Sequence, residues 1–242
     1  MSDPTAPMQD DSPTPRDAGL SLVEVIVAIG LFGLVATILL GFAISTSRVT
    51  EDTRGMANVG EESRLAMERM TRELRQARQI QHVDLGSATE PLSFTFWTDF
   101  DNDNQLATAG VDPELLTYRW YPAGSADAAN RGKLTLTAND IDGNSITRPV
   151  LAAKVTAFSV DFNSSSWEYA PTPSATPDPN EDSVTTWQDL DRKAAPIGNN
   201  NGLLDGNELK LIDLMNIRMT VTDGTHQLNY RTQVDLRNQN QN

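Results

Sequence analysis

The longest apolar run of the chain extends from Leu20 to Ile44 and contains a single charged residue, Glu24. A helix of 25 residues is about 37 Å long, whereas the apolar interior of a bilayer is about 30 Å thick. A soluble helix is rarely apolar on every face over such a length. The run therefore predicts a transmembrane helix over residues 20–44. The polar residues 1–19, rich in Pro, Asp and Ser, are expected to have no fold of their own.

Residues 45–80 show a different pattern, in which apolar or small residues recur at spacings of three and four. This period is typical of an amphipathic helix, and charged residues occupy its other faces. We expect the segment to continue the membrane helix and to pack its apolar stripe against the head. Gly55 and Gly60 are expected to kink or partly unwind it near its start. The stripe consists of Met56, Val59, Ser63, Met67, Met70, Leu74 and Ala77.

Beyond residue 80 the chain consists of short segments rich in β-branched and aromatic residues, separated by turn signals such as Asp223-Gly224. This order predicts an α+β fold: a long N-terminal helix followed by an antiparallel β head over residues 81–242. A Pro- and Asn-rich stretch, 163–200, predicts a long exposed loop. Trp167 and Trp187 flank it, either to hold its ends against the sheet or to contact a partner. The expected strands are 92–97, 115–121, 133–137, 155–162, 216–222 and 230–236.

The N-terminal apolar run differs from an ordinary secretory signal peptide. A signal peptide has a shorter apolar stretch and a small-residue cleavage site after it, whereas Ala18-Gly19 precede the run here. A plain membrane anchor would explain the length but not Glu24. A charged residue at the centre of a membrane helix costs about 2.5–3.5 kcal/mol on insertion scales, and less near its end. Glu24 therefore predicts a functional site with a specific partner.

The segment Gly19-Leu20-Ser21-Leu22-Val23-Glu24-Val25 resembles the processing site of type IV prepilins and type II secretion pseudopilins. The resemblance implies that a prepilin peptidase cleaves between Gly19 and Leu20, and that Leu20 is then N-methylated. Cleavage creates an α-ammonium at Leu20 in apolar surroundings. Glu24 of a neighbouring subunit can pair with it, so that two costly charges compensate each other during assembly.

Two features of this segment differ from the family's usual pattern. Leu20 stands where the family usually has Phe, and Arg16 is the one basic residue of the leader. Lys and Arg are more frequent on the far side of the membrane run, so the positive-inside rule does not give the orientation. The expected orientation, with the head outside the cytoplasm, therefore comes from the resemblance.

The head has a looser resemblance to minor pilins of the PilW type and pseudopilins of the GspJ type. It is carried by Thr117-Tyr118-Arg119-Trp120-Tyr121, by the strands that follow, and by the terminal Val234-Asp235-Leu236-Arg237-Asn238. It implies a low-copy type IV pilus subunit that acts in assembly initiation or at the tip. The alternatives are a J-type pseudopilin of type II secretion, and a calcium-dependent adhesin or binding module on a pilin anchor.

The pilin resemblance also implies a location and a set of partners. It places the protein in the bacterial cytoplasmic (inner) membrane as a single-pass subunit, and afterwards in a pilus or pseudopilus. The implied partners are the prepilin peptidase, other pilins or pseudopilins that pack through the N-terminal helix, and the inner-membrane assembly platform.

Composition narrows the chemistry further. A net charge of −14 argues against nucleic acid as a partner, because phosphate binding needs clustered Lys and Arg, but it is compatible with calcium. The chain has no Cys, which excludes disulfides and thiolate metal sites. His82 and His226 lie far apart in the sequence, which disfavours zinc. The sequence has neither a Walker-type phosphate loop nor a Gly-x-Ser-x-Gly elbow, so we expect no enzymatic activity and no required cofactor.

Two segments have the spacing of calcium loops. In the first, carboxylates alternate along a turn, which brings hard oxygens around one ion. In the second, Gly202 stands at the sixth position of an EF-hand-like loop and Glu208 at the last, while Ile197 at the first position offers no side-chain ligand. Solvated acidic or Asn-Gly turns are the alternative at both. The candidate ligands are Asp99, Asp101 and Asp103 in the first loop, and Asn199, Asn201, Asp205 and Glu208 in the second.

Overall fold

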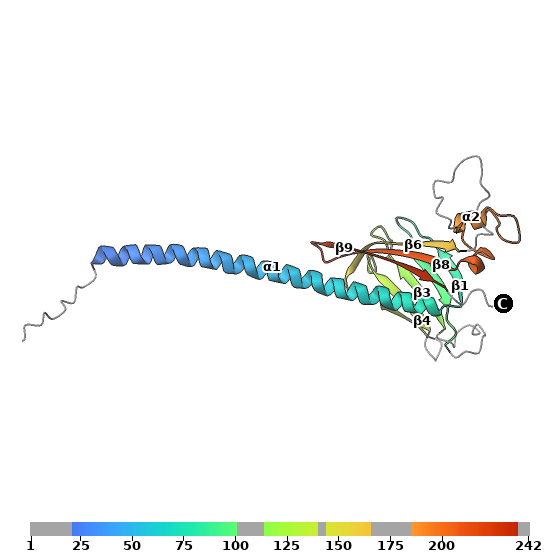
Figure 1. Cartoon of the computed structure of the whole chain (residues 1–242), viewed down its shortest axis with the longest axis horizontal. Coiled ribbons are helices and arrows are strands. Elements are labelled where there is room, and N and C mark those ends of the chain that lie inside the picture. Colours follow the sequence, from blue (N-terminus) through green and yellow to red (C-terminus); the bar gives the residue numbers. More distant parts are fainter. Residues whose placement is uncertain (1–20, 101–113, 140–143, 166–184, 237–242) are drawn as a thin grey trace, which may run out of the picture. The chain divides into compact units, whose positions relative to one another are not determined.

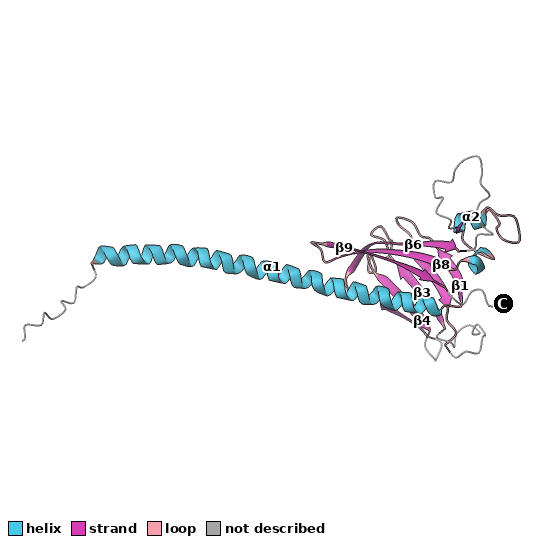
Figure 2. Cartoon of the chain, in the orientation of Figure 1, coloured by secondary structure: helices cyan, strands magenta, loops and turns pink. Residues whose placement is uncertain are grey.

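The computed structural model describes residues 21–100, 114–139, 144–165 and 185–236. A long helix is followed by two antiparallel sheets (Figures 1 and 2), so the predicted α+β fold is confirmed. The chain divides into two units between Asp52 and Thr53, and the helix runs through both. The elements are α1 (Leu22–Gln76), β1 (Gln79–Asp84), β2 (Leu92–Trp97), β3 (Leu115–Trp120), β4 (Leu134–Asn139), β5 (Ser145–Pro149), β6 (Lys154–Ser164), β7 (Thr185–Thr186), α2 (Trp187–Asp191), a 3₁₀ turn (Glu208–Leu211), β8 (Leu214–Thr222) and β9 (Gln227–Asp235).

Helix α1 is continuous over 55 residues, so Gly55 and Gly60 lie inside it and the unwinding predicted there is absent. A residue of β9 stabilises the helix backbone at Gly60, because the Tyr230 hydroxyl donates a hydrogen bond of 2.9 Å to the Gly60 carbonyl. The helix ends at Gln76, four residues before the predicted end at 80. The chain then joins a sheet, where the Arg78 backbone N–H bonds the Trp97 carbonyl at 2.8 Å.

The first sheet has five strands in sequential order, β1-β2-β3-β4-β5, and every neighbouring pair is antiparallel. Strand β2 lies inside the sheet and pairs Phe94 with Tyr118 of β3. Its residues are buried on both faces, apart from Thr95, which is intermediate. At the opposite edge, every residue of β5 is exposed. A strand without buried side chains has no apolar alternation, which is why β5 was not predicted.

The second sheet has the order β7-β6-β8-β9, and its strands are also antiparallel. Strands β6 and β8 form its centre, with a register that shifts between Val155 and Ala157. Within the stretch predicted as a long loop, 163–200, β6 continues to Ser164 and 185–191 form β7 and α2, whereas 166–184 lie outside the described residues. Trp187 is partly buried and packs against the core, which agrees with the first of its two alternatives. Trp167 lies outside the described residues.

The second half of α1 forms the core together with the two sheets. Ser63, Met67, Met70, Leu74 and Ala77 are buried, as the helical stripe predicts, and so is Ala66, whereas Met56 is 40% exposed. The Phe94 and Phe162 rings lie 6.1 Å apart at 75°, an edge-to-face contact that joins the two sheets. Apolar packing therefore fixes the face that α1 presents to the head.

Polar contacts between α1 and the head determine where the helix sits along that face. The Glu62 carboxylate accepts hydrogen bonds from the backbone N–H groups of Ala152 and Ala153. The Glu73 carboxylate accepts one from the buried Tyr118 hydroxyl. Burial, together with the neighbouring Glu73 carboxylate, raises the pKa of Tyr118, so the hydroxyl keeps its proton. These two carboxylates therefore fix the position of α1 along the head.

Truncating a buried side chain of the apolar stripe of α1 should destabilise the head. Met70 is fully buried, so Met70→Ala is expected to cost about 2–5 kcal/mol of unfolding free energy. This corresponds to a fall in Tm of about 5–15 °C for a domain of this size. Tryptophan fluorescence of the full chain in detergent during heating measures it. Met56→Ala on the same helix is the control and should change Tm little, and equal losses for both variants would contradict the packing described here.

Candidate functional site

Ser21 and Glu24 form two hydrogen bonds with each other at the start of α1. The Ser21 backbone N–H donates to the Glu24 carboxylate at 3.1 Å, and the Glu24 backbone N–H donates to the Ser21 hydroxyl at 3.3 Å. This reciprocal pair is a capping box, which satisfies two N–H groups at the helix start. The Ser-x-x-Glu spacing is the usual signal of this box, but it was not predicted here, because both residues also belong to the processing motif. Gly19 and Leu20 lie outside the described residues.

The capping box gives Glu24 a defined place although its side chain is exposed. Its carboxylate is held at the first turn of α1, where the helix dipole favours a negative charge. The proposed cleavage point lies four residues earlier in the sequence. Glu24 is therefore held at the helix start and is accessible to a positive group of another chain.

The first part of α1 is apolar on all sides. Every Leu, Ile, Val and Phe between Leu22 and Ile44 is at least 40% exposed. The hydroxyl of Thr37 is satisfied inside the helix by the Gly33 carbonyl at 2.8 Å. By length and composition this helix can span a membrane. Its apolar side chains find no cover among the described residues, so lipid or other chains must supply it.

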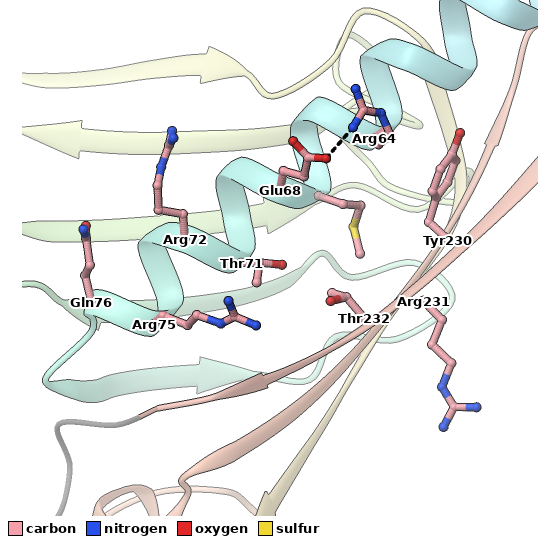
Figure 3. Close-up of a pocket in the computed structure, with 10 residues that line it drawn as sticks. Arg64, Glu68, Thr71, Arg72, Arg75, Gln76, Tyr230, Arg231 and Thr232 are labelled. Carbon is pink, nitrogen blue, oxygen red and sulfur yellow. Dashed lines mark hydrogen bonds and ion pairs between the residues drawn. The ribbon is translucent and has the colours of Figure 1, made fainter.

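The last turns of α1 and the edge strand β9 line a groove of about 640 Å³. Figure 3 shows its side chains, which include four arginines and one acid. The acid, Glu68, bonds Arg64 at 2.6 Å. The lining therefore holds more basic than acidic side chains, although the Arg231 side chain extends away from α1. The groove was not predicted, because arginines on a helix face usually indicate only charges exposed to solvent. The arginines are Arg64, Arg72, Arg75 and Arg231.

The described part of the first predicted calcium loop is engaged by protein groups. Asp99 forms an ion pair with Arg78 at 2.8 Å, and its side chain is 1% exposed. Glu114 accepts hydrogen bonds from the Trp97 indole at 2.8 Å and from the Phe100 backbone at 2.7 Å. Asp101 and Asp103 lie outside the described residues. Calcium binding at this loop stays a prediction.

The second predicted loop brings its polar residues close together. The side-chain amides of Asn199 and Asn201 each donate to a different Asp205 oxygen at 2.9 Å. Gly202 has a φ of 75°, which favours glycine over other residues. Glu208 is 1% exposed. Burial and the nearby carboxylates of Asp191 and Asp205 raise its pKa.

One further residue of this region, Asp191 at the end of α2, was not predicted. Its carboxylate accepts hydrogen bonds of 3.0 Å from the backbone N–H groups of Asn201 and Gly202. It lies ten residues before Asn201, outside the spacing of a continuous loop, so no sequence motif includes it. We call these residues the acidic loop site: Asp191, Asn199, Asn201, Asp205 and Glu208.

The described residues of this site do not form a chelating arrangement. Among the described residues, no three His, Cys, Asp or Glu side chains are arranged to hold a metal ion. The carboxylate of Asp205 is instead bound by two amide groups. Calcium at the acidic loop site therefore stays a prediction at this point.

Comparison with known proteins bears on the N terminus. A family model described as the prokaryotic N-terminal methylation motif matches residues 14–40. This range includes Gly19, Leu20, the capping box and most of the apolar part of α1. No curated protein and no solved structure shows a significant match to the chain. The motif supports a type IV pilin-like protein, processed by a prepilin peptidase, anchored in the inner membrane and assembled with other pilins or pseudopilins.

Proposed function

We propose that this protein is a minor, low-copy subunit of a type IV pilus that acts in assembly initiation or at the tip. The observation that carries the proposal is the start of α1, where an exposed apolar helix begins with a fixed and accessible Glu24. The helix supplies the membrane anchor and the packing surface, and Glu24 supplies the specific contact.

The apolar surface of α1 explains why the subunit needs a fibre. In the inner membrane, lipid covers the side chains between Leu22 and Ile44. A subunit that leaves the membrane exposes all of them to water unless other helices cover them. At about 25 cal/mol per Å² of apolar area, this exposure is strongly unfavourable. Packing against the helices of other pilins removes it and drives incorporation.

Glu24 would set how far neighbouring helices are offset along the fibre. After cleavage, the α-ammonium of Leu20 stands four residues before Glu24 of the same chain. Pairing between subunits would offset two parallel helices by about 6 Å, at about 1.5 Å per residue. An unpaired charge in apolar surroundings is costly, so assembly with the correct offset is favoured over other arrangements.

The size of the head favours an end position. It contains two sheets of five and four strands. Subunits in a fibre shaft repeat at close intervals and leave little lateral room, whereas a subunit at the tip has neighbours on one side. A J-type pseudopilin of type II secretion would share the same processed helix. That alternative is distinguished by genomic neighbours: a retraction ATPase indicates a pilus, and a secretin with several pseudopilin genes indicates secretion.

The variant Glu24→Gln removes the charge while keeping the shape of the side chain. The prepilin peptidase should still cleave it, because Gly19 and Leu20 are unchanged. Incorporation into fibres should fall at least tenfold, since breaking a buried ion pair costs about 3–5 kcal/mol. Immunoblots of whole cells and sheared fibres measure both steps.

Glu51→Gln is the matched control for this experiment. It makes the same chemical change on α1, at an exposed position beyond the apolar segment. It should be cleaved and incorporated like the wild-type protein. Normal incorporation of Glu24→Gln, or equal losses in both variants, would contradict the pairing role.

A tip or initiating role also predicts a copy number. Immunogold labelling of the head should find a few copies for each fibre, concentrated at one end. Deletion of the gene should reduce the number of fibres more than their length, because initiation is lost. Label spread evenly along the shaft would indicate a major subunit instead, and loss of protein secretion with intact pili would indicate a pseudopilin.

A further inference from the structure

The acidic loop site resembles a calcium loop in which one ligand position is missing from the loop itself. A carboxylate from α2 takes its place in the folded chain. Gly202 takes the sixth position with a positive φ, and Glu208 takes the last. Ile197 has no ligand oxygen at the first position. The carboxylate of Asp191 instead reaches the loop from α2 and bonds the backbone at its fifth and sixth positions.

Asp191 is held firmly against the loop. A capping box between Thr186 and Asp189 defines the start of α2. At its end, the Asp191 carbonyl accepts the Asn200 backbone N–H at 2.8 Å. A side chain at Gly198 would place its Cβ 2.4 Å from the same carbonyl, so the close approach requires glycine. The short helix and the loop therefore form one unit.

Glu208 is the observation that points to a ligand. It is 1% exposed, and its Oε2 atom has no hydrogen-bond partner among the described residues. The ionisable groups that act on it are the carboxylates of Asp191 and Asp205, both of the same sign. A buried carboxylate with an unsatisfied oxygen and like-charged neighbours is costly. A cation at this point would satisfy the oxygen and offset the repulsion.

We propose that the acidic loop site binds one calcium ion. All five side chains offer oxygen, the donor atom that Ca²⁺ prefers, and none offers nitrogen from His or sulfur. Amide and carboxylate oxygens from a loop suit Ca²⁺ better than Mg²⁺, which demands a smaller and stricter octahedron. On binding, the side-chain amides of Asn199 and Asn201 would rotate so that their oxygens face the ion and Asp205 is released to it. The rotation exchanges the hydrogen bonds that these oxygens now accept from the backbone N–H groups of Asn201 and Leu203 for bonds to the ion.

Calcium would then join three parts of the head. Its ligands come from α2, from the loop after it, and from the 3₁₀ turn that begins at Glu208. The 3₁₀ turn contacts both α2 and β1. A bound ion would thus fix the connection between β7 and β8 at this end of the head. This proposal is independent of the assembly role and could hold in either fibre system.

The test compares the full chain in detergent with and without calcium. After treatment with EGTA, the wild-type protein should bind one Ca²⁺ in calorimetric titration. Its Tm should rise by about 5–10 °C once calcium exceeds Kd about a hundredfold. Glu208→Gln should weaken calcium binding at least tenfold. Without calcium, its Tm should equal or exceed that of the wild type, because the buried charge is removed.

The matched control is Glu90→Gln, the same change at an exposed acid of the β1–β2 connection. It should bind calcium like the wild-type protein. A purely structural Glu208 would instead give a variant with a lower Tm at every calcium concentration. The proposal is overturned by that result, by a wild-type Tm that calcium leaves unchanged, or by equal calcium responses of wild type and Glu208→Gln.

Discussion

Helix α1 must be stable in two different surroundings without a break in its backbone. Hydrogen bonds inside the helix satisfy its backbone groups, which is required in lipid, where no water can do so. Beyond the apolar part, the same helix supplies one wall of the core of the head through residues such as Met70 and Leu74. Polar contacts at Gly60, Glu62 and Glu73 prevent it from sliding or turning on that core. The apolar anchor and the core of the head thus depend on one element.

Most of the fold was predictable, because its main elements have strong local patterns. Strand β2 was predicted with its observed bounds, and the helix stripe was correct from Val59 to Ala77. The errors occur where local pattern and tertiary contact disagree. Residues 79 and 80 look helical, but pairing with β2 makes them part of β1. Gly60 suggests a weak helix, but a hydroxyl from β9 supports it from outside.

The candidate sites also differ in how far they could be predicted, because some consist of neighbours in the sequence and others form only through tertiary contacts. Glu24 stands out because a charge in an apolar run is locally anomalous, and the spacing of the second loop is equally local. Asp191 could not be predicted, because its role comes from the contact between α2 and a loop that follows later in the chain. The groove combines side chains of α1 with Tyr230 of β9, more than 150 residues away in sequence. Residues that meet only through folding leave no motif.

The continuity of α1 also has a mechanical consequence. In the fibre proposed here, a pull along the packed helices would enter the head through the second half of α1. The helix lies along the core, with its contacts distributed from Val59 to Ala77. A pull along the helix axis therefore loads these contacts in shear, so that many must break together rather than one after another. The packing that gives the head its core also makes its attachment resistant to tension.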